Sequence, residues 1–222
     1  MGMAVSIHQW LAHLTAPKAS SGPGSSLPGC FDPVVAGLHD AANALLKWCN
    51  MTSSWTERLL HDLVILADAH GCFSDLLLSM KQLLVEAQAA VRHRDVVRLA
   101  AALHTCRRSD RGLSGLASSL HGLSHPSSSS TSVLAEAVTV AMCVAAAASS
   151  AIFLGLASTS TSSALPVLTS PTVASPVMAM KWLRSLEECV VAAEDGCEQV
   201  HRALVNTMGS LLDILTSFCL TP

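Results

Sequence analysis

Tyrosine is absent from this 222-residue sequence, and aromatic residues make up only 4% of it. β-Sheets depend on aromatic and β-branched side chains, so this shortage favours helices, and the abundance of Ala and Leu agrees. Charged residues are also scarce, at 13%, and the formal net charge is −3. That charge excludes a general electrostatic attraction to nucleic acid. The composition therefore predicts an all-α protein for which nucleic acid is not the expected partner.

The eight cysteines contain no C-x-x-C pair, which argues against the common zinc and redox motifs. Most of them fall inside helical patterns, so we interpret them as reduced core residues of an intracellular, cytoplasmic protein. The N-terminus lacks the basic start and long apolar run of a secretory signal. Gly2 and Ser6 fit the M-G-x-x-x-[ST] myristoylation pattern, but no polybasic segment follows. A lipidated start and an unmodified, frayed start both remain open.

Motifs of catalysis are missing as well. Residues 112–118, GLSGLAS, lack the spacing of a G-x-S-x-G nucleophile elbow. Two His/Cys pairs are each two residues apart, which directs their side chains to different faces of a helix (His70 with Cys72, His104 with Cys106). We therefore expect no catalytic residue, no metal site and no cofactor, and we expect that the protein is not an enzyme.

Three stretches rich in Ser, Pro or Gly interrupt the helical patterns, at residues 16–29, 124–132 and 158–176. Such composition stops regular structure. The predicted organisation is a flexible N-terminal segment, 1–30, followed by a single α-helical bundle domain, 31–220. The second and third stretches are low-complexity linkers within that domain.

Apolar residues recur every three or four positions between the linkers, which predicts an antiparallel bundle of four or five helices. The expected starts are an N-cap at Asp32 before Pro33, a capping box over 54–57, Asp95, Ser132, and Ser175 before Pro176. Gly71 lies inside the second helix, which we expect to continue past it. The fourth helix is expected to end before residue 158, and the last near Phe218.

The last helix has the clearest pattern, because its apolar residues form a seam over its whole length. The seam comprises Leu183, Leu186, Val190, Ala193, Cys197, Val200, Leu204, Met208, Leu211 and Leu215. The opposite face carries five acidic residues, Glu187, Glu188, Glu194, Asp195 and Glu198. We interpret this acidic face as solvated surface, with a basic partner as the alternative.

Residues 137–157, AVTVAMCVAAAASSAIFLGLA, contain no charge and are long enough to span a bilayer. Alanines and small polar residues bring the expected free energy of insertion near balance, and neither end has a basic cluster or an aromatic belt. Small residues also suit a helix packed closely among others. We predict a buried bundle helix; the alternative is a membrane-attached protein with this segment inserted.

Two segments resemble the BYPASS-related proteins, a plant-specific family. ERLLHDLVILADAHGCFSDLLLSMKQLLVEAQAAVRHR, residues 57–94, is similar to the family's long helix, with its acidic-leucine start and basic end. LRSLEECVVAAEDGCEQVHRALVNTMGSLLDILTS, residues 183–217, is similar to its closing helix, with paired glutamates and a leucine-rich end. The middle, 112–180, resembles the family less. The resemblance implies an all-α protein linked to root and shoot development that acts through an unknown protein partner, without catalytic residues to transfer.

The strongest charge cluster is RHRDVVRLAAALHTCRRSDR, residues 92–111. We predict that Arg94, Arg98 and Arg108 share part of one helical face. Asp95 and Asp110 interrupt the cluster, and no aromatic side chain is present to stack on bases. An anionic membrane or an acidic protein suits it better than nucleic acid, and a solvated turn region without a partner is the other interpretation. The candidate anionic-partner surface comprises Arg92, Arg94, Arg98, Arg107, Arg108 and Arg111.

Overall fold

The computed structural model describes residues 29–46, 53–124, 133–161 and 176–219, and within them it is helical with no strand. The prediction of an all-α bundle is confirmed. The helices are α2 (Asp32–Leu46), α3 (Ser53–His93), α4 (Val96–His121), α5 (Val133–Thr161) and α7 (Pro176–Cys219), with a short 3₁₀ helix, η1 (Gly122–Ser124). The myristoylation motif and nearly all of the N-terminal segment lie outside these residues.

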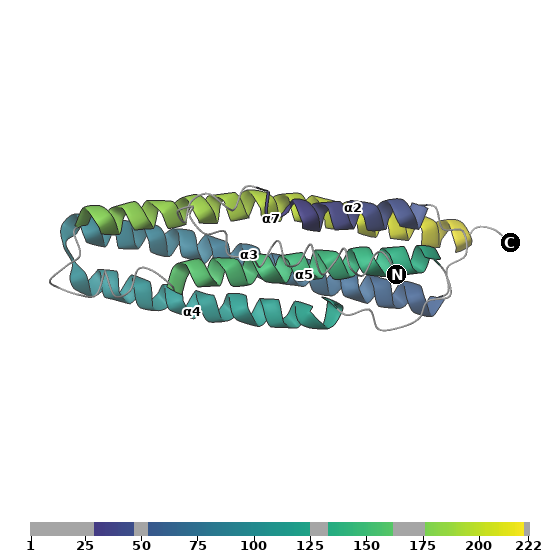
Figure 1. Cartoon of the computed structure of the whole chain (residues 1–222), viewed down its shortest axis with the longest axis horizontal. Helices are drawn as coiled ribbons and strands as arrows, with labels where there is room; N and C mark the ends of the chain where they lie inside the picture. Colours follow the sequence, from purple (N-terminus) through teal and green to yellow (C-terminus); the bar gives the residue numbers. More distant parts are fainter. Residues whose placement is uncertain (1–28, 47–52, 125–132, 162–175, 220–222) are drawn as a thin grey trace.

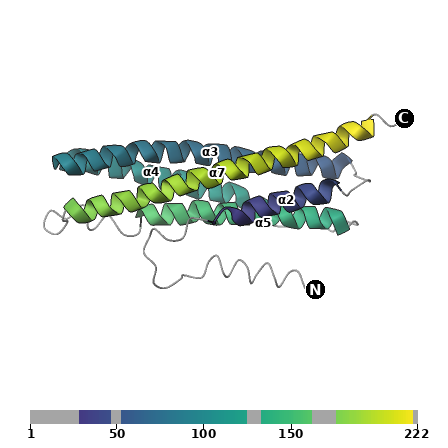
Figure 2. The same cartoon turned by 90° about the horizontal axis from the view of Figure 1, so that it is seen from above.

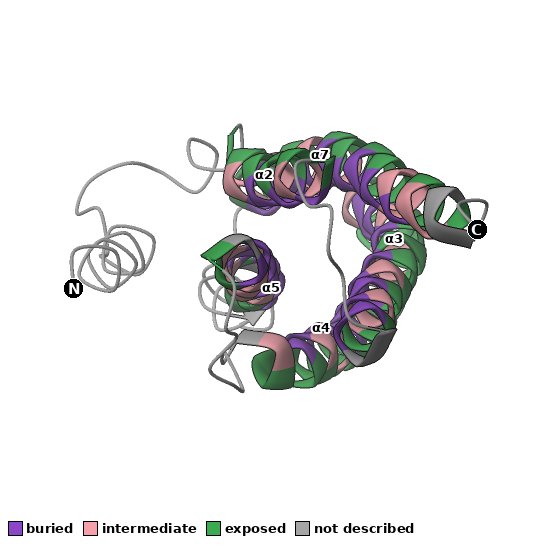
Figure 3. Ribbon diagram, turned by 90° about the vertical axis from the view of Figure 1, so that its right-hand side faces the viewer, coloured by how far each residue is buried: buried purple, intermediate pink, exposed green. Residues whose placement is uncertain are grey.

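The two longest helices, α3 and α7, run the length of an elongated bundle, as Figures 1 and 2 show. The shorter helix α2 covers one end, α4 covers the other, and α5 lies between them. Neighbours pack in the cyclic order α2, α5, α4, α3, α7 and back to α2. Buried faces point inward all round this ring (Figure 3). Of the helices that the structure describes, only α3 and α7 therefore reach both ends of the bundle.

Helix starts agree with the predicted signals to within about one residue. In α2, the Phe31 carbonyl accepts the first helical hydrogen bond, from the amide of Val35 at 3.0 Å. Asp32 is thus the first helical residue rather than the N-cap, which corrects the prediction. Helix α3 begins at Ser53, before the predicted capping box, and it continues past Gly71 as predicted.

Burial along α7 follows the predicted seam, with Met208 and Leu215 half-buried and the rest of the seam buried. The acidic face is less uniform than predicted. Glu194 accepts a hydrogen bond from the Lys81 ammonium at 2.6 Å. Glu187 accepts one from the Gln88 amide at 2.7 Å. Two of the five acidic residues therefore attach α7 to α3, because they lie at the border of the seam.

Helix α5 packs between α2 and α4, and it buries side chains on more than one side. Within 137–157 only Ala137, Leu154 and Gly155 are exposed. The helix continues to Thr161, so the predicted linker begins later than residue 158. Ser158 tolerates the helical conformation because its hydroxyl donates to the Leu154 carbonyl at 2.8 Å.

Two glycines allow helices to approach closely where larger residues would clash. A Cβ on Gly37 would lie 3.0 Å from the Ala141 carbonyl oxygen, where α2 meets α5. A Cβ on Gly196 would lie 2.1 Å from a ring carbon of Phe31, which precedes α2. The Phe31 ring therefore packs directly on the backbone of α7. The sequence patterns did not single out either contact.

Candidate functional site

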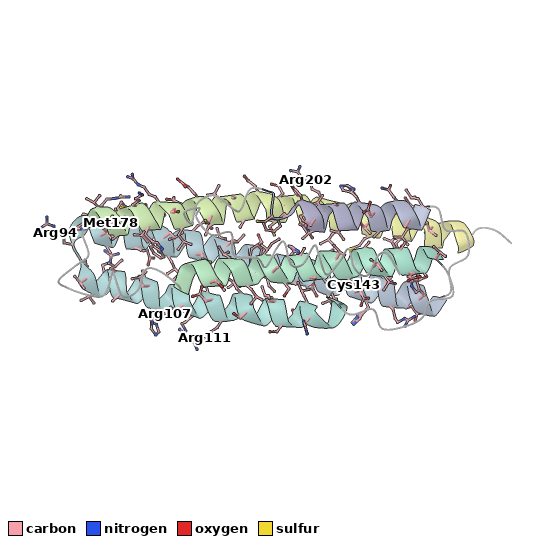
Figure 4. All side chains as sticks on the ribbon, in the orientation of Figure 1. Arg94, Arg107, Arg111, Cys143, Met178 and Arg202 are labelled. Carbon is pink, nitrogen blue, oxygen red and sulfur yellow. The ribbon has the colours of Figure 1, made fainter. Side chains whose placement is uncertain are left out.

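The six predicted arginines are all exposed, but the structure divides them into two groups. Arg92, Arg94 and Arg98 lie around the turn that joins α3 to α4, at one end of the bundle. Arg107, Arg108 and Arg111 lie along α4. Figure 4 shows Arg94 at the extreme end and Arg107 and Arg111 pointing away from the bundle on its side. We call the first group the end arginines and the second group the flank arginines.

The end arginines are placed by a tight helix-ending turn. The Asp95 amide donates to the Ala90 carbonyl at 2.9 Å, and the Arg94 amide donates to the Val91 carbonyl at 3.3 Å. This is the Schellman pattern, and it puts Arg94 in the left-handed region with φ of 55°. Glycine usually occupies that position, because a side chain there is disfavoured by roughly 1–2 kcal/mol. Asp95 then caps α4 by accepting from the Arg98 amide at 3.0 Å.

Arg94 therefore precedes α4 and shares no helical face with Arg98 and Arg108, which corrects the prediction. The physical reason is the turn, which reverses the chain between Arg94 and the first turn of α4. Within α4, Arg107, Arg108 and Arg111 are neighbours at spacings of three and four residues. Neither these three nor Arg94 and Arg98 form an ion pair within the part of the chain that the structure describes.

Helix α7 brings two further cations to the end of the bundle, and sequence reasoning missed them. Lys181 and Arg184 are exposed in its first turns. Four apolar side chains at the starts of α4 and α7 are also exposed: Val96 at 72%, Val97 at 80%, Val177 at 74% and Met178 at 60%. Figure 4 shows Met178 and Arg94 at the same end of the bundle. The sequence did contain a signal for this surface, because apolar residues that do not belong to the buried seam directly follow the starts of α4 and α7.

A second polar group lies at the centre of the core and joins three helices. His70 of α3 is 2% exposed, and its Nε2 lies 2.9 Å from the hydroxyl of Ser149 on α5. The Ser149 hydroxyl donates to the Ala145 carbonyl at 2.9 Å. It therefore accepts from His70, which assigns the proton to Nε2. The thiol of Cys197 on α7 lies 3.8 Å from Nδ1, the acceptor side of the ring.

Burial suppresses the reactivity of both partners. It lowers the pKa of His70 to about 4, and His201 adds a smaller effect in the same direction. Burial also raises the pKa of Cys197 to about 11. A Cys/His nucleophile needs a thiolate beside an imidazolium, and these shifts favour the neutral thiol and the neutral ring. Phe73 and Phe153 surround the ring, with the Phe153 centroid 5.4 Å from it.

This histidine predicts acid sensitivity. Its pKa in the fold, about 4, lies below the ordinary value of 6.5. The unfolded chain therefore takes up the proton first, and stability falls as the pH falls from about 6.5 to about 4. Between about pH 7 and about pH 5 the expected loss is about 2 kcal/mol. Denaturant unfolding of wild type and His70→Gln over this range should show a flatter pH profile for the variant.

An exposed histidine supplies the matched control. His39→Gln should leave the pH profile of stability as it is in wild type, because His39 lies on the outer face of α2. Equal flattening by both substitutions would contradict the assignment of the acid-sensitive step to His70.

No group of three or more His, Cys, Asp or Glu side chains could hold a metal ion, as far as the described residues extend. The pairs His70 with Cys72 and His104 with Cys106 do not converge on a common ligand. Cys72 is exposed while His70 is buried, and His104 is exposed while Cys106 is buried. Six cysteines whose side chains the structure describes are thiols. Five of them are buried or half-buried, and the exposed Cys72 departs from the predicted core position.

A family model described as Protein BPS1 matches residues 36–175. The chain belongs to the BPS1 family. This confirms the BYPASS-related assignment. No curated protein and no solved structure matches the chain.

The BPS1 match covers the end arginines, the flank arginines, His70 and Ser149. It includes the first segment that showed the resemblance, 57–94, and most of the middle, 112–180, which had seemed least similar. The second segment, 183–217, lies beyond the match, together with Cys197, Lys181 and Arg184. The BPS1 assignment therefore rests on α2 to α5, and α7 completes the bundle that those helices begin.

Proposed function

We propose that this BPS1-family protein is a non-enzymatic interaction protein that acts in root and shoot development by binding another protein. The family resemblance supplies the developmental context. The observation that carries the mode of action is the group of flank arginines, Arg107, Arg108 and Arg111, on the outer face of α4. Their charges are exposed, and no described acidic side chain pairs with them.

An acidic protein surface suits the flank arginines better than a small ligand does. The three side chains project from about one turn of the convex outer surface of α4, so several carboxylates on a partner surface could each reach one guanidinium. A small ligand needs a concave site that buries most of its surface. The flank arginines project from one helix, α4, whose other face is packed in the core. They therefore do not line a concave site.

Absence of catalysis is supported by the state of the core cluster. His70 and Cys197 are the buried pair with the residue types of a nucleophilic site. Their pKa values favour the unreactive forms, and Phe73 and Phe153 pack against the ring. We propose that this cluster fixes the register of α3, α5 and α7. Hydrogen-bonded polar groups in a core can serve that purpose.

Proximity labelling in root tissue tests the proposal. A plant line without the protein would receive either wild type or the triple variant Arg107→Gln, Arg108→Gln, Arg111→Gln. We expect the triple variant to fold normally, to lose the partner that wild type labels, and to fail to restore root growth. Substitutions on exposed faces usually change stability by about 0.5 kcal/mol or less.

The matched control removes three charges of the opposite sign from α7, with Glu188→Gln, Asp195→Gln and Glu198→Gln. These side chains are exposed. The control should label the wild-type partner and restore root growth. If the flank variant also does both, the proposed surface is wrong.

A membrane-attached protein with residues 137–157 inserted is the alternative. Two described helices are long and apolar enough to cross a bilayer: Trp55–His93 and Ala135–Ser158, whose mean hydropathy is 2.1. Core helices of soluble bundles meet the same criterion, and half of the second window is buried in the bundle. Alkaline carbonate extraction separates the readings. Release into the supernatant supports the bundle, and retention until detergent is added supports the inserted form.

A further inference from the structure

One end of the bundle exposes apolar and basic side chains together. We call it the basic end and define it as residues 92–98 and 176–184. Val96 and Val97 follow the cap of α4, and Val177 and Met178 follow the first residue of α7, Pro176. Their exposed fractions are between 60% and 80%. Single exposed apolar residues are normal, but neighbouring ones at one end of a molecule indicate an interaction site.

Packing inside the bundle shows that the three helix ends stop at the same level. A small cavity of about 10 Å³ is lined by Ala87 of α3, Ala102 of α4 and Trp182 of α7, among others. Beyond this layer, α3 continues to its end at His93, and α4 and α7 extend back to their starts at Val96 and Pro176. Each helix therefore extends six residues, or roughly 9 Å, beyond the residue that lines the cavity. The exposed apolar residues therefore belong to helix starts that lie at one end of the bundle, together with the end of α3 (Figures 1 and 2).

The charge of this end is opposite to that of the whole chain. Five cationic side chains, Arg92, Arg94, Arg98, Lys181 and Arg184, stand against one anionic side chain, Asp95. The whole chain has a formal charge of −3. Two helix N-termini, those of α4 and α7, and one C-terminus, that of α3, face this end, so the partial positive charge of one N-terminus is left uncompensated. The basic end thus presents an apolar tip surrounded by positive charge.

Arg94 adds an independent observation. It holds the left-handed conformation that glycine would hold more stably, with φ of 55°. The chain therefore carries a cation at the outermost point of the turn although the turn itself disfavours it. Backbone strain of this kind points to function when it coincides with a candidate surface.

We propose that the basic end docks the protein on the surface of an anionic lipid bilayer. Val96, Val97, Val177 and Met178 enter the headgroup layer, and the surrounding cations contact lipid phosphates. Basic residues beside exposed apolar side chains are the recognised combination for reversible, peripheral binding to anionic membranes. An acidic protein would match the charge, but it would not require four apolar side chains on a convex end. This site is separate from the flank arginines of the proposed function.

Flotation of the full-length protein with vesicles tests the proposal. Wild type should bind vesicles of phosphatidylcholine mixed with phosphatidylserine, should not bind phosphatidylcholine alone, and should be released by salt. The variant Arg92→Gln, Arg94→Gln, Arg98→Gln should bind roughly 100-fold more weakly, because each of the three charges contributes about fivefold. The variant Val96→Ser, Val97→Ser, Val177→Ser, Met178→Ser should also lose most binding.

Two matched controls keep the test specific. Arg107→Gln, Arg108→Gln, Arg111→Gln removes the same charge from the side of α4. Val133→Ser with Leu212→Ser removes exposed apolar residues, 82% and 52% exposed, near the opposite end. Both controls should bind vesicles nearly as wild type does. Equal loss in the controls would mean that total charge or general stickiness drives binding, and would overturn the proposal.

Other outcomes also decide. No binding by wild type, or binding to a soluble acidic protein alone, would contradict membrane docking. Binding that resists salt and all end substitutions would indicate insertion of α5 instead.

Arg94→Gly separates a binding role from a structural one, because it should raise the melting temperature while weakening vesicle binding. A gain in stability without weaker binding would remove Arg94 from the site. None of these results depends on the protein partner of the flank arginines.

Discussion

Replacing Leu204 by aspartate is expected to leave the protein unfolded or aggregated. Leu204 is 1% exposed and lies in the middle of the α7 seam. A carboxylate there would lose its hydration without a described cation to pair with, which costs several kcal/mol. A domain of this size is stable by roughly 5–15 kcal/mol, so the loss is a large part of the total. Circular dichroism and denaturant unfolding of the purified variant measure it.

The neighbouring residue provides the control. Val205 is 54% exposed on the other side of the same helix turn. Val205→Asp introduces the same charge into the same stretch of α7, and it should change stability by about 0.5 kcal/mol or less. Equal damage from both variants would mean that the face of α7 has been assigned wrongly.

The buried face of α7 could be predicted from the sequence because helical periodicity is a local signal. The seam of α7, the continuation of α3 past Gly71 and the Asp95 cap all follow from residues close together in the chain. The sequence also predicted that residues 137–157 lie in a helix, because small apolar residues run through them without a charge; the position of α5 in the ring, between α2 and α4, was not predicted. The predicted starts of α2 and α3 were wrong by about one residue. The N-cap is the residue whose carbonyl accepts the first helical hydrogen bond, and the local sequence does not specify that residue uniquely.

Contacts between distant segments were not predictable in the same way. Ser149 and Cys197 lie 79 and 127 positions from His70, and no local pattern joins them. The basic end has the same origin. Arg92, Arg94 and Arg98 could be identified as a cluster, but Lys181 and Arg184 join them only because α7 starts beside the α3–α4 turn. The exposure of Val96 and Val97 follows from their place beyond the last packed layer.

One of these contacts between distant segments, that of Phe31 with Gly196, is where two segments of the chain pack most tightly. Phe31 precedes α2 and is 3% exposed, and its ring lies against Gly196 in α7 and 6.3 Å from the ring of Phe73. Gly196 reads in the sequence as a weak point of a helix, because glycine disfavours helix formation by up to about 1 kcal/mol relative to alanine. In the fold it provides the space that lets the aromatic cluster reach the backbone of α7.

Gly196→Ala is therefore expected to destabilise the protein by about 3 kcal/mol, the upper part of the usual range for overpacking. The added Cβ would lie 2.1, 2.5 and 2.7 Å from three ring atoms of Phe31. The ring cannot move away easily, because it is buried. Helix propensity alone predicts that alanine at this position stabilises the protein. The sign of the change in stability therefore decides whether helix propensity or the contact with Phe31 dominates. Thermal and denaturant unfolding measure it.

Gly71→Ala is the matched control, since a Cβ on Gly71 meets nothing within 4 Å and the residue is exposed in α3. It should stabilise the protein by up to about 1 kcal/mol. In a Phe31→Ala background the penalty of Gly196→Ala should largely disappear, because the ring supplies the three closest atoms. This double-mutant cycle isolates the pair. A penalty that persists without the ring would mean that another contact of Gly196, not Phe31, requires glycine there.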